Sequence, residues 1–372
     1  MFSKALPFLL LIFVSCTSRE TNKISLKLQI DSLSIPIDSS YMNSYYVFSY
    51  NDKTGKLTGF NSDRQKLDYF DLSSRNALGS TKLEKEGPDG VNEVSGLHFQ
   101  SQDSIFVQDG LFLKLIDSKG KVKSKFDITE NAKKVLGRPI VNQYVRLYYN
   151  SNRKSFIYFL TLENPKKIDQ PIFAEYRIEN RMLNVLPISF SEYFLKNDGK
   201  MGFLSYANAT IVEDNQLIYN YLFSNDIFSY DLKNHNTVKT KSESSITKSI
   251  ASPLLPTAGG DLEKWQIHAI ENPYFFQMIY DKNKKLFYQF SWQEIPYEKK
   301  DNTFVSFVDK PLVLSVFDEN LVLLHEEKLP KNTYMPFSWF VTNDGLFVSN
   351  QHPKNPSLNE DRLSFHVIRI TR

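Results

Sequence analysis

The sequence of 372 residues contains 45 Lys and Arg against 42 Asp and Glu, a formal charge of +3, and a single cysteine. So small a positive excess argues against a nucleic-acid-binding protein, which needs a concentrated basic face, and 41% hydrophobic with 23% charged residues excludes a disordered chain. Alanine occurs only 9 times, whereas Phe and Tyr occur 29 and 20 times. Because alanine is the best helix former and aromatic residues favour strands, a mostly β protein is predicted.

The first 15 residues have the composition of a lipoprotein signal peptide. Lys4 precedes an apolar run over residues 5–14, which is too short to cross a bilayer as a helix but suits a signal-peptide core. The run ends at Ser15-Cys16, and a small residue directly before a cysteine resembles the bacterial lipoprotein box. In proteins with that box the leader is cut before the cysteine, which then carries fatty acyl chains such as palmitate. The alternative is an ordinary signal peptide with a chance cysteine.

We therefore predict a lipoprotein signal peptide over 1–15, a lipidated tether over 16–23 that binds the membrane through Cys16, and a folded domain over 24–372. Several acyl chains hold a protein to a membrane far more firmly than one chain does. Thr17 stands where an Asp would signal inner-membrane retention in some Gram-negative bacteria. The expected location is therefore the cell envelope, at the outer membrane.

The rest of the chain repeats one pattern, in which an apolar strand ends in an acidic or amide turn and further strands follow through hairpins. The clearest copy has hairpin signals at Asp109-Gly110 and at Ser118-Lys119-Gly120. The copies cover residues 45–72, 104–126, 143–188, 210–241, 275–328 and 338–370, and the third copy begins with a predicted strand over 143–149. Six copies of about 60 residues each fit propeller blades with some long loops. A stacked sandwich would also alternate, but it would not need so many similar units.

The predicted fold is an all-β, single β-propeller with six blades of four antiparallel strands. The last copy lacks an outer strand, and residues 24–30 alternate well at the other end of the chain. We predict that this N-terminal strand pairs with residues 363–370 and closes the ring, which removes an open sheet edge.

Breaks in the pattern indicate insertions and solvent-facing strands. Ser242–Gly260 is rich in Ser, Thr and Pro, and Asp261–Ile270 is predicted to be a short helix capped by Asp261. Residues 129–136 are a second predicted helical turn. Lys121, Lys123 and Lys125 recur at every second position; they could form a phosphate-binding stripe, but the solvent face of an outer strand is the favoured interpretation.

Signatures of catalysis are mostly absent from the sequence. The histidines are His98, His235, His268, His325, His352 and His366. No two of them are three or four residues apart, so the chain has no compact zinc pattern. Nucleotide-binding glycine loops and the Gly-x-Ser-x-Gly nucleophile motif are missing as well. No catalytic residue, metal site or cofactor is predicted.

One segment is distinctive: Lys85-Glu86-Gly87-Pro88-Asp89-Gly90-Val91, followed by Leu97-His98-Phe99. It resembles the Gly-Pro segment ahead of an early blade in six-bladed propeller lipoproteins of Bacteroidetes, in the uncharacterised family called domain of unknown function 4221. Chain length, lipoprotein box and aromatic blades are similar too. The resemblance implies a β-propeller on the cell envelope and supplies no agreed activity, so no catalytic residue is carried over.

Two functions are compatible with this sequence. The favoured hypothesis is a membrane-anchored binding or scaffold module that recognises a glycan, a peptide or an envelope protein. The alternative is a propeller enzyme, a hydrolase or lyase, with its site in the central channel; a purely structural envelope protein is a third option. Converging carboxylates or a metal beside a histidine would favour an enzyme, whereas aromatic and amide side chains without a titratable pair would favour binding.

The ligand site is predicted on the channel, near the first strand of each blade. The polar candidates are His98, Arg146 and Tyr206 from three successive copies, with Trp265 or His268 from the insertion as a lid. Arg and His suit an anionic group, and a stacked aromatic side chain suits the face of a sugar. The alternative is that all five are ordinary structural residues.

Overall fold

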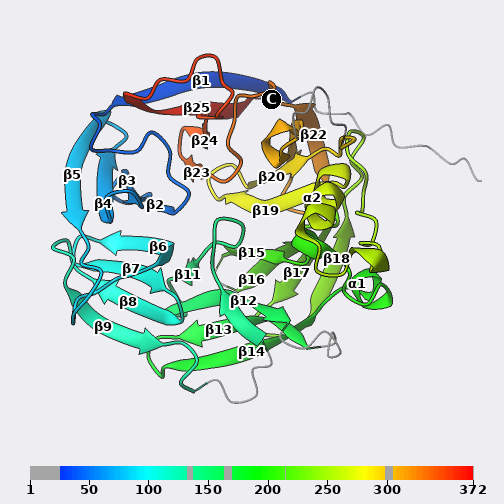
Figure 1. Ribbon diagram of the computed structural model, residues 1–372, viewed down its shortest axis with the longest axis horizontal. Helices are drawn as coiled ribbons and strands as arrows, with labels where there is room; N and C mark the ends of the chain where they lie inside the picture. Colours follow the sequence, from blue (N-terminus) through cyan, green and yellow to red (C-terminus); the bar gives the residue numbers. More distant parts are fainter. Residues whose placement is uncertain (1–25, 132–136, 163–169, 214, 298–304, 372) are drawn as a thin grey trace, which may run out of the picture.

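The computed structural model describes residues 26–131, 137–162, 170–213, 215–297 and 305–371. The described strands form six antiparallel sheets arranged in a ring, which Figure 1 shows along the ring axis. Each sheet is a blade whose first strand lies nearest the axis, and successive strands follow outward. The predicted six-bladed propeller is confirmed.

The first two blades follow the N-terminal strand. Blade I consists of β2 (Phe48–Asn51), β3 (Lys56–Asn61), β4 (Lys66–Asp71) and β5 (Asn76–Lys82). Blade II consists of β6 (Val94–Ser101), β7 (Ser104–Asp109), β8 (Phe112–Ile116) and β9 (Val122–Asp127). Lys121, Lys123 and Lys125 are exposed at outer strand β9, as the solvent-face interpretation predicts.

Blade III differs from the others because two short strands share its inner edge. It consists of β10 (Gly137–Ile140), β11 (Tyr148–Asn150), β12 (Ser155–Leu162), β13 (Pro171–Arg177) and β14 (Met182–Ser189). Both β10 and β11 pair with β12. The sequence predicted one strand over 143–149, whereas the structure places a connecting segment over 141–147.

Blades IV and V match their predicted copies closely. Blade IV consists of β15 (Ala207–Val212), β16 (Gln216–Tyr221), β17 (Asp226–Asp231) and β18 (Thr237–Lys241). Blade V consists of β19 (Tyr274–Asp281), β20 (Leu286–Trp292), β21 (Leu312–Phe317) and β22 (Leu323–Lys328).

Blade VI joins the two ends of the chain. It consists of β23 (Trp339–Thr342), β24 (Gly345–Ser349), β25 (Arg362–Thr371) and β1 (Lys27–Pro36). Strand β1 pairs with β25 from Lys27 opposite Thr371 to Pro36 opposite Arg362. Closure by an N-terminal strand is confirmed, but the strand lies later than the predicted 24–30, of which 24 and 25 are outside the described residues. Ile30 is exposed, and beyond it the apolar positions change phase to Leu33 and the fully buried Ile35, so the favourable pairing does not stop at residue 30.

The strands end in a recurrent five-residue turn that begins with Asp or Asn. In the β2–β3 turn, Asn51 Oδ1 accepts hydrogen bonds from the backbone N–H groups of Lys53 and Thr54. In the β19–β20 turn, Asp281 Oδ1 accepts from Asn283 and Lys284 in the same way. This arrangement satisfies backbone donors at the end of a strand.

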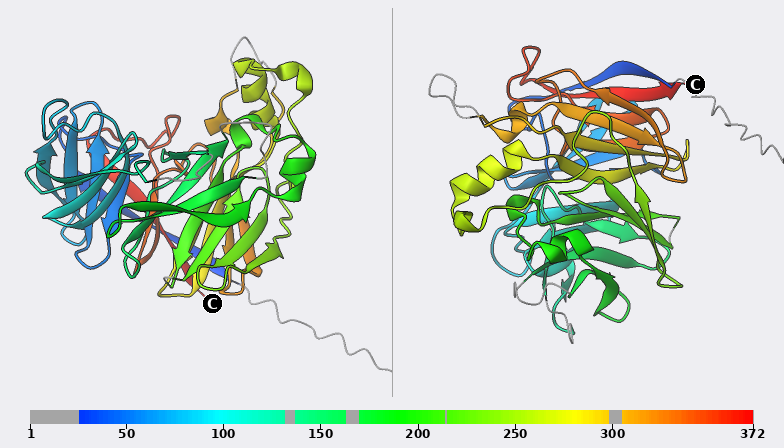
Figure 2. Two further views of the ribbon diagram at one scale, coloured as in Figure 1. Left: turned by 90° about the horizontal axis from the view of Figure 1, so that it is seen from below. Right: turned by 90° about the vertical axis from the view of Figure 1, so that its right-hand side faces the viewer.

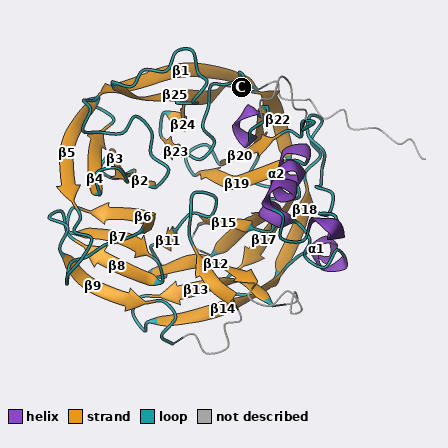
Figure 3. Ribbon diagram, viewed as in Figure 1, coloured by secondary structure: helices purple, strands orange, loops and turns teal. Residues whose placement is uncertain are grey.

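The helices gather at one end of the ring, which we call the helical face (Figure 2), and on one side of it in the axial view (Figure 3). Helix α1 is Glu192–Lys196 and α2 is Leu262–Glu271; the 3-10 helices are Gly202–Leu204, Pro256–Ala258 and Phe307–Asp309. The predicted cap of α2 is confirmed, because Asp261 Oδ1 accepts from the N–H groups of Glu263 and Lys264. The predicted turn over 129–136 lies mostly outside the described residues. No helix among the described residues is long and apolar enough to cross a membrane.

The opposite end of the ring, the termini face, carries the start of β1 and the end of β25. Strand β25 runs parallel to β23 because both are antiparallel to β24. Thr371 therefore lies at the same end of the ring as Thr342, and Arg369 Nε donates to the carbonyl of Asp344 in the β23–β24 turn.

The Gly-Pro segment lies between blades I and II and is held against blade II. Lys114 of β8 donates to the carbonyl of Gly90 and forms a buried ion pair with Asp109. Asp89 accepts a hydrogen bond of 2.9 Å from the N–H of Val122. In this chain the segment that carries the family resemblance therefore has a structural role.

Candidate functional site

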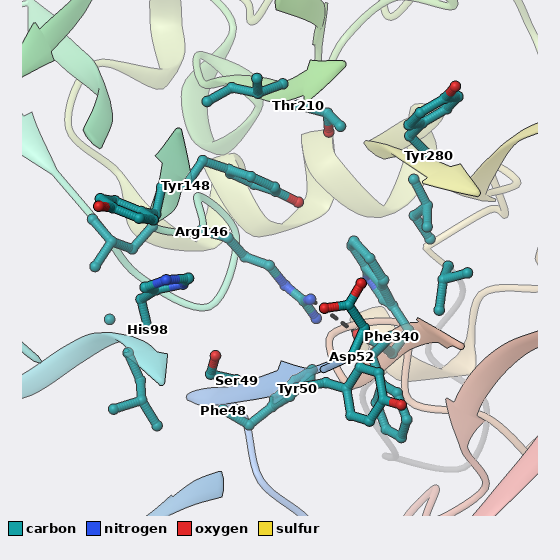
Figure 4. Close-up of a pocket in the computed structure, with 18 of the residues that line it drawn as sticks. Phe48, Ser49, Tyr50, Asp52, His98, Arg146, Tyr148, Thr210, Tyr280 and Phe340 are labelled. Atoms are coloured by element: carbon teal, nitrogen blue, oxygen red, sulfur yellow. Dashed lines mark hydrogen bonds between the residues drawn. The ribbon is translucent and has the colours of Figure 1, made fainter. Parts of the chain in front are cut away.

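A cavity of about 420 Å³ lies on the ring axis, and its lining includes residues from the inner strands of all six blades. Figure 4 shows the side chains that surround it. It opens toward the termini face, where Asp52, Lys282 and Asn343 of the β2–β3, β19–β20 and β23–β24 turns are exposed. Because every blade contributes, the complete ring is needed to form this site.

Aromatic side chains form much of the cavity wall. They are Tyr46, Phe48, Tyr50, Tyr148, Tyr149, Tyr280, Trp339 and Phe340. The rings of Tyr50 and Phe340 stack, with centroids 4.9 Å apart and planes at 25°. Such a wall offers flat apolar surface to a ring of a ligand.

Arg146 lies in the segment between β10 and β11, which we call the plug (residues 141–147). Asn142 Oδ1 accepts from the N–H groups of Tyr144 and Val145, at 2.8 and 2.9 Å, and so bends the chain inward. Arg146 Nη1 then donates to the carbonyl of Trp339 at 3.0 Å, and Nη2 donates to that of Phe337 at 2.6 Å. Blade III is thus joined to blade VI, its opposite in the ring.

The plug crosses the channel near the helical face. The ring of Tyr144 packs against Phe337, with centroids 5.2 Å apart, and lies near Tyr274. Tyr274 begins β19 directly after α2, and Phe337 directly precedes β23. Arg146 therefore lies deep in the cavity as seen from the mouth at the termini face.

The Arg146 guanidinium lies between two aromatic rings. Its central carbon is 3.8 Å from the ring centroid of Trp339 and 4.6 Å from that of Phe48. Burial lowers the pKa of Arg146 to about 10, which still leaves the group protonated at neutral pH. In the described part of the chain no ion pair involves Arg146, so carbonyl oxygens and aromatic faces stabilise its charge.

His98 of β6 also lines the cavity, but as a neutral group. Its ring packs against Tyr149, with centroids 4.7 Å apart, and near Phe106 and Phe156. Burial among these rings lowers the pKa of His98 to about 4. The histidine therefore adds hydrogen-bonding capacity without charge. Arg and His were expected to attract an anion together, whereas in the structure only Arg146 carries the positive charge for this.

The other three predicted site residues are not among those that line the cavity. Tyr206 directly precedes β15 and packs edge-on against Phe159, with centroids 5.7 Å apart. Trp265 of α2 packs against Phe203 and donates from Nε1 to the carbonyl of Gly259 at 2.9 Å. His268 of α2 is buried with its Nε2 2.6 Å from the carbonyl oxygen of Ser252. Trp265 and His268 thus hold the insertion together.

Sequence reasoning missed most of the aromatic wall. Phe48, Tyr50, Trp339 and Phe340 all lie in first strands of copies, so the aromatic content of those strands was the available signal. Arg146 was assigned to a strand, whereas it lies in the plug, because its position depends on carbonyls about 190 residues away in sequence.

The cavity has few titratable groups. Its charged lining residues in the described part of the chain are Arg146, Asp52 and Lys282, and the last two form an ion pair at the mouth. Within the described ranges no group of three or more His, Cys, Asp or Glu could hold a metal ion. A converging pair of carboxylates, as most glycoside hydrolases use, is not found in this lining.

Comparisons with known proteins give a family and a fold. Residues 23–328 match the family described as Domain of unknown function (DUF4221). A crystal structure of a DUF4221 member from Bacteroides vulgatus is 15% identical, covers 94% of this chain and 99% of that chain, and has a TM-score of 0.78. A Bacteroides fragilis protein, provisionally named as exported, is 11% identical over 93% and 96% of the two chains, with a TM-score of 0.58. At these identities the likeness shows the fold alone. No curated protein gives a match.

Proposed function

The chain belongs to the DUF4221 family, and from the site that its propeller builds we propose a binding module of the cell envelope that takes a glycan or a peptide end into the central cavity. One observation carries this proposal: the cavity joins an aromatic wall to Arg146, a half-buried cation that forms no ion pair among the described residues. A preformed cavity in which a few fixed polar groups orient a ligand beside apolar surface is typical of binding sites.

The alternative of a hydrolase or lyase receives less support from the same lining. Its carboxylate, Asp52, is exposed at the mouth and is paired with Lys282. His98 has a pKa of about 4 because of its burial, which makes it a poor general base at neutral pH. We therefore favour binding over catalysis.

Obstruction of the mouth tests the binding proposal. Asn343 is exposed at the mouth, so Asn343→Trp should fold normally and block entry. The matched control is Asn234→Trp, in the exposed β17–β18 turn outside the cavity lining. Ligands found in a calorimetric screen of cell-wall glycans and peptides should bind the control and lose at least about tenfold affinity for Asn343→Trp. A screen without hits, or equal binding to both variants, would contradict the proposal.

We further propose that Cys16 anchors the protein to the outer membrane. The support is the leader with its Ser15-Cys16 box and the short polar segment before the fold. In a producing bacterium, Cys16→Ala should release the protein from membranes or leave an uncleaved precursor. A processed, fatty-acid-labelled variant that still fractionates with membranes would show that the anchor lies elsewhere.

A further inference from the structure

The charge in the cavity identifies the class of ligand. Resting on the proposed binding function, we propose that the ligand is a small ring-containing acid with one negative charge, whose carboxylate binds Arg146 while its ring lies against the aromatic wall. An acidic sugar and an aromatic acid share this chemistry, and the experiment below distinguishes them.

The charges of the cavity lining do not balance. Asp52 and Lys282 neutralise each other at the mouth, so the described lining carries a net charge of +1 from Arg146. Arg146 is half-buried, and the partial loss of water around a guanidinium without a carboxylate partner is only partly offset by carbonyls and rings. A monoanionic ligand would supply the missing partner.

Arg146 is already positioned and has hydrogen-bond donors that its protein partners do not use. Two of its N–H groups are used on the carbonyls of Trp339 and Phe337, which leaves about three of the five N–H donors of a guanidinium. The bonds to these carbonyls and the contact with Trp339 fix the group before a ligand arrives. Figure 4 shows Arg146 extending into the cavity between Tyr148 and Phe48. A preorganised donor loses little entropy on binding.

The groups around Arg146 limit the charge of the ligand to one. His98 is neutral, and Lys282 is already paired with Asp52, so one charge of a phosphate dianion would remain unmatched. A carboxylate matches a single guanidinium in both charge and geometry. The cavity of about 420 Å³ and its stacked Tyr50–Phe340 pair favour a ring beside that carboxylate.

Two matched pairs of probes test the inference on the wild-type protein by calorimetry at neutral pH and low salt. Phenyl β-D-glucuronide is compared with phenyl β-D-glucoside, and benzoate with benzamide. In each pair only the acid carries the negative charge. We expect at least one acid to bind about tenfold or more tightly than its neutral counterpart. A preference for the glucuronide indicates an acidic sugar, and a preference for benzoate indicates an aromatic acid.

Variants then locate the charge. Arg146→Gln should remove the preference for the acid, whereas Arg138→Gln, an exposed arginine of β10 outside the cavity lining, should keep it. Because Arg146 also fixes the plug, Arg146→Lys provides a second variant that keeps the charge and should keep part of the preference.

Several outcomes would overturn the inference. They are an acid that binds no better than its neutral counterpart, two acids that fail to bind at millimolar concentration, and an acid preference that persists in a folded Arg146→Gln. If neutral glycans from the wider screen bind nevertheless, the binding function stands and only the ligand class is wrong.

Discussion

Arg146 and His98 line the same cavity, yet burial acts differently on their charges. An arginine starts from so high a pKa that a fall to about 10 leaves it charged, whereas a histidine whose pKa falls to about 4 is neutral over most of the physiological range. Among the described lining residues, the cavity therefore has one cation without an ion-pair partner, Arg146, and one neutral polar ring, His98. This division could not be predicted from residue types alone, because it depends on the rings of Tyr149, Phe106 and Phe156 around the histidine.

Replacement of His98 should make the unfolding free energy of the protein less dependent on pH in the acidic range. In the unfolded chain His98 has a pKa of about 6.5 and in the folded protein about 4, so below pH 6.5 the unfolded state binds more protons. The contribution of neutral His98 to the unfolding free energy is therefore fully present above pH 6.5. It is lost as the pH falls from 6.5 toward 4. The maximal effect is about 3 kcal/mol. We expect the loss of unfolding free energy between pH 7.5 and 4.5 to be about 2–3 kcal/mol smaller in His98→Gln.

Urea denaturation at several pH values measures this difference. His268 and His366, whose pKa values burial also lowers, are present in both proteins and cancel in the comparison. Parallel pH profiles for the two proteins would show that His98 is not neutral in the folded state.

At the scale of elements, the fifth residue of the five-residue turn adopts a left-handed backbone conformation that favours glycine. Gly55 holds this position in the β2–β3 turn with φ of +67°, and Arg75 holds it in the β4–β5 turn with φ of +56°. No atom lies within 4 Å of a Cβ added at Gly55, so the cost of Gly55→Ala is purely conformational. We expect a loss of about 1 kcal/mol.

The converse change is Arg75→Gly, which relieves the same backbone conformation at an exposed position. Relief of the left-handed backbone competes with the greater chain entropy of glycine, so we expect a gain of less than about 1 kcal/mol. Thermal melts of the two single variants and the parent measure both effects. A Gly55→Ala protein as stable as the parent would refute the argument.

The sequence predicted strands well where apolar residues alternate and a turn follows. Blades IV and V agree with their predicted bounds almost throughout, because their strands begin and end at such signals. Strand β5 was missed: it carries Gly79 with φ of +104° and pairs with β4 through a register shift. The plug was predicted as strand because Val145, Leu147 and Tyr149 alternate, whereas its course is set by contacts with blade VI that lie beyond local periodicity.

The candidate site, like the strands, could be predicted from local sequence patterns only in part. The ring and its inner strands could be inferred from repeats, so a site on the channel was a natural expectation. Which side chains face the cavity depends on the register of each strand, where a shift of one residue reverses every side chain. Of the predicted candidates, His98 and Arg146 line the cavity, while Trp265 and His268 stabilise the helical insertion.

For the whole molecule, closure of the ring by β1 makes stability depend on residues that touch no ligand. A protein that begins at Ile37 lacks all ten residues of β1 and exposes the edge of β25. It loses several backbone hydrogen bonds worth about 1 kcal/mol each and the burial of Ile35. Since total stability is about 5–15 kcal/mol, we expect such a protein to unfold or to melt more than about 10 °C lower.

A shorter truncation provides the matched control for this prediction. A protein that begins at Asp31 keeps the pairing from Asp31 to Pro36, including the buried Ile35. Its melting temperature should therefore lie between those of the mature protein and the longer truncation. If the protein that begins at Ile37 melts with the mature protein, β1 does not close the ring.

The topology also relates the cavity to the proposed anchor. The mouth and the start of β1 share the termini face, whereas α2 lies at the helical face. Residues 17–26 can span at most about 33–36 Å, and an eight-residue inner strand such as β19 adds about 27 Å between the two faces. A protein held at Cys16 should therefore keep its mouth nearer the membrane than its helices.

Two cysteine variants test this orientation on protein acylated at Cys16 and bound to vesicles. Leu262→Cys is on α2, where Leu262 is 67% exposed, and Asn343→Cys is at the mouth. A large maleimide-polyethylene glycol should modify Asn343→Cys several-fold more slowly than Leu262→Cys, because the bilayer hinders its approach to the termini face. In detergent the two rates should converge, which controls for intrinsic thiol reactivity. A rate ratio that is the same in vesicles and detergent would show that the cavity does not face the membrane, and its ligand would then be sought in free solution.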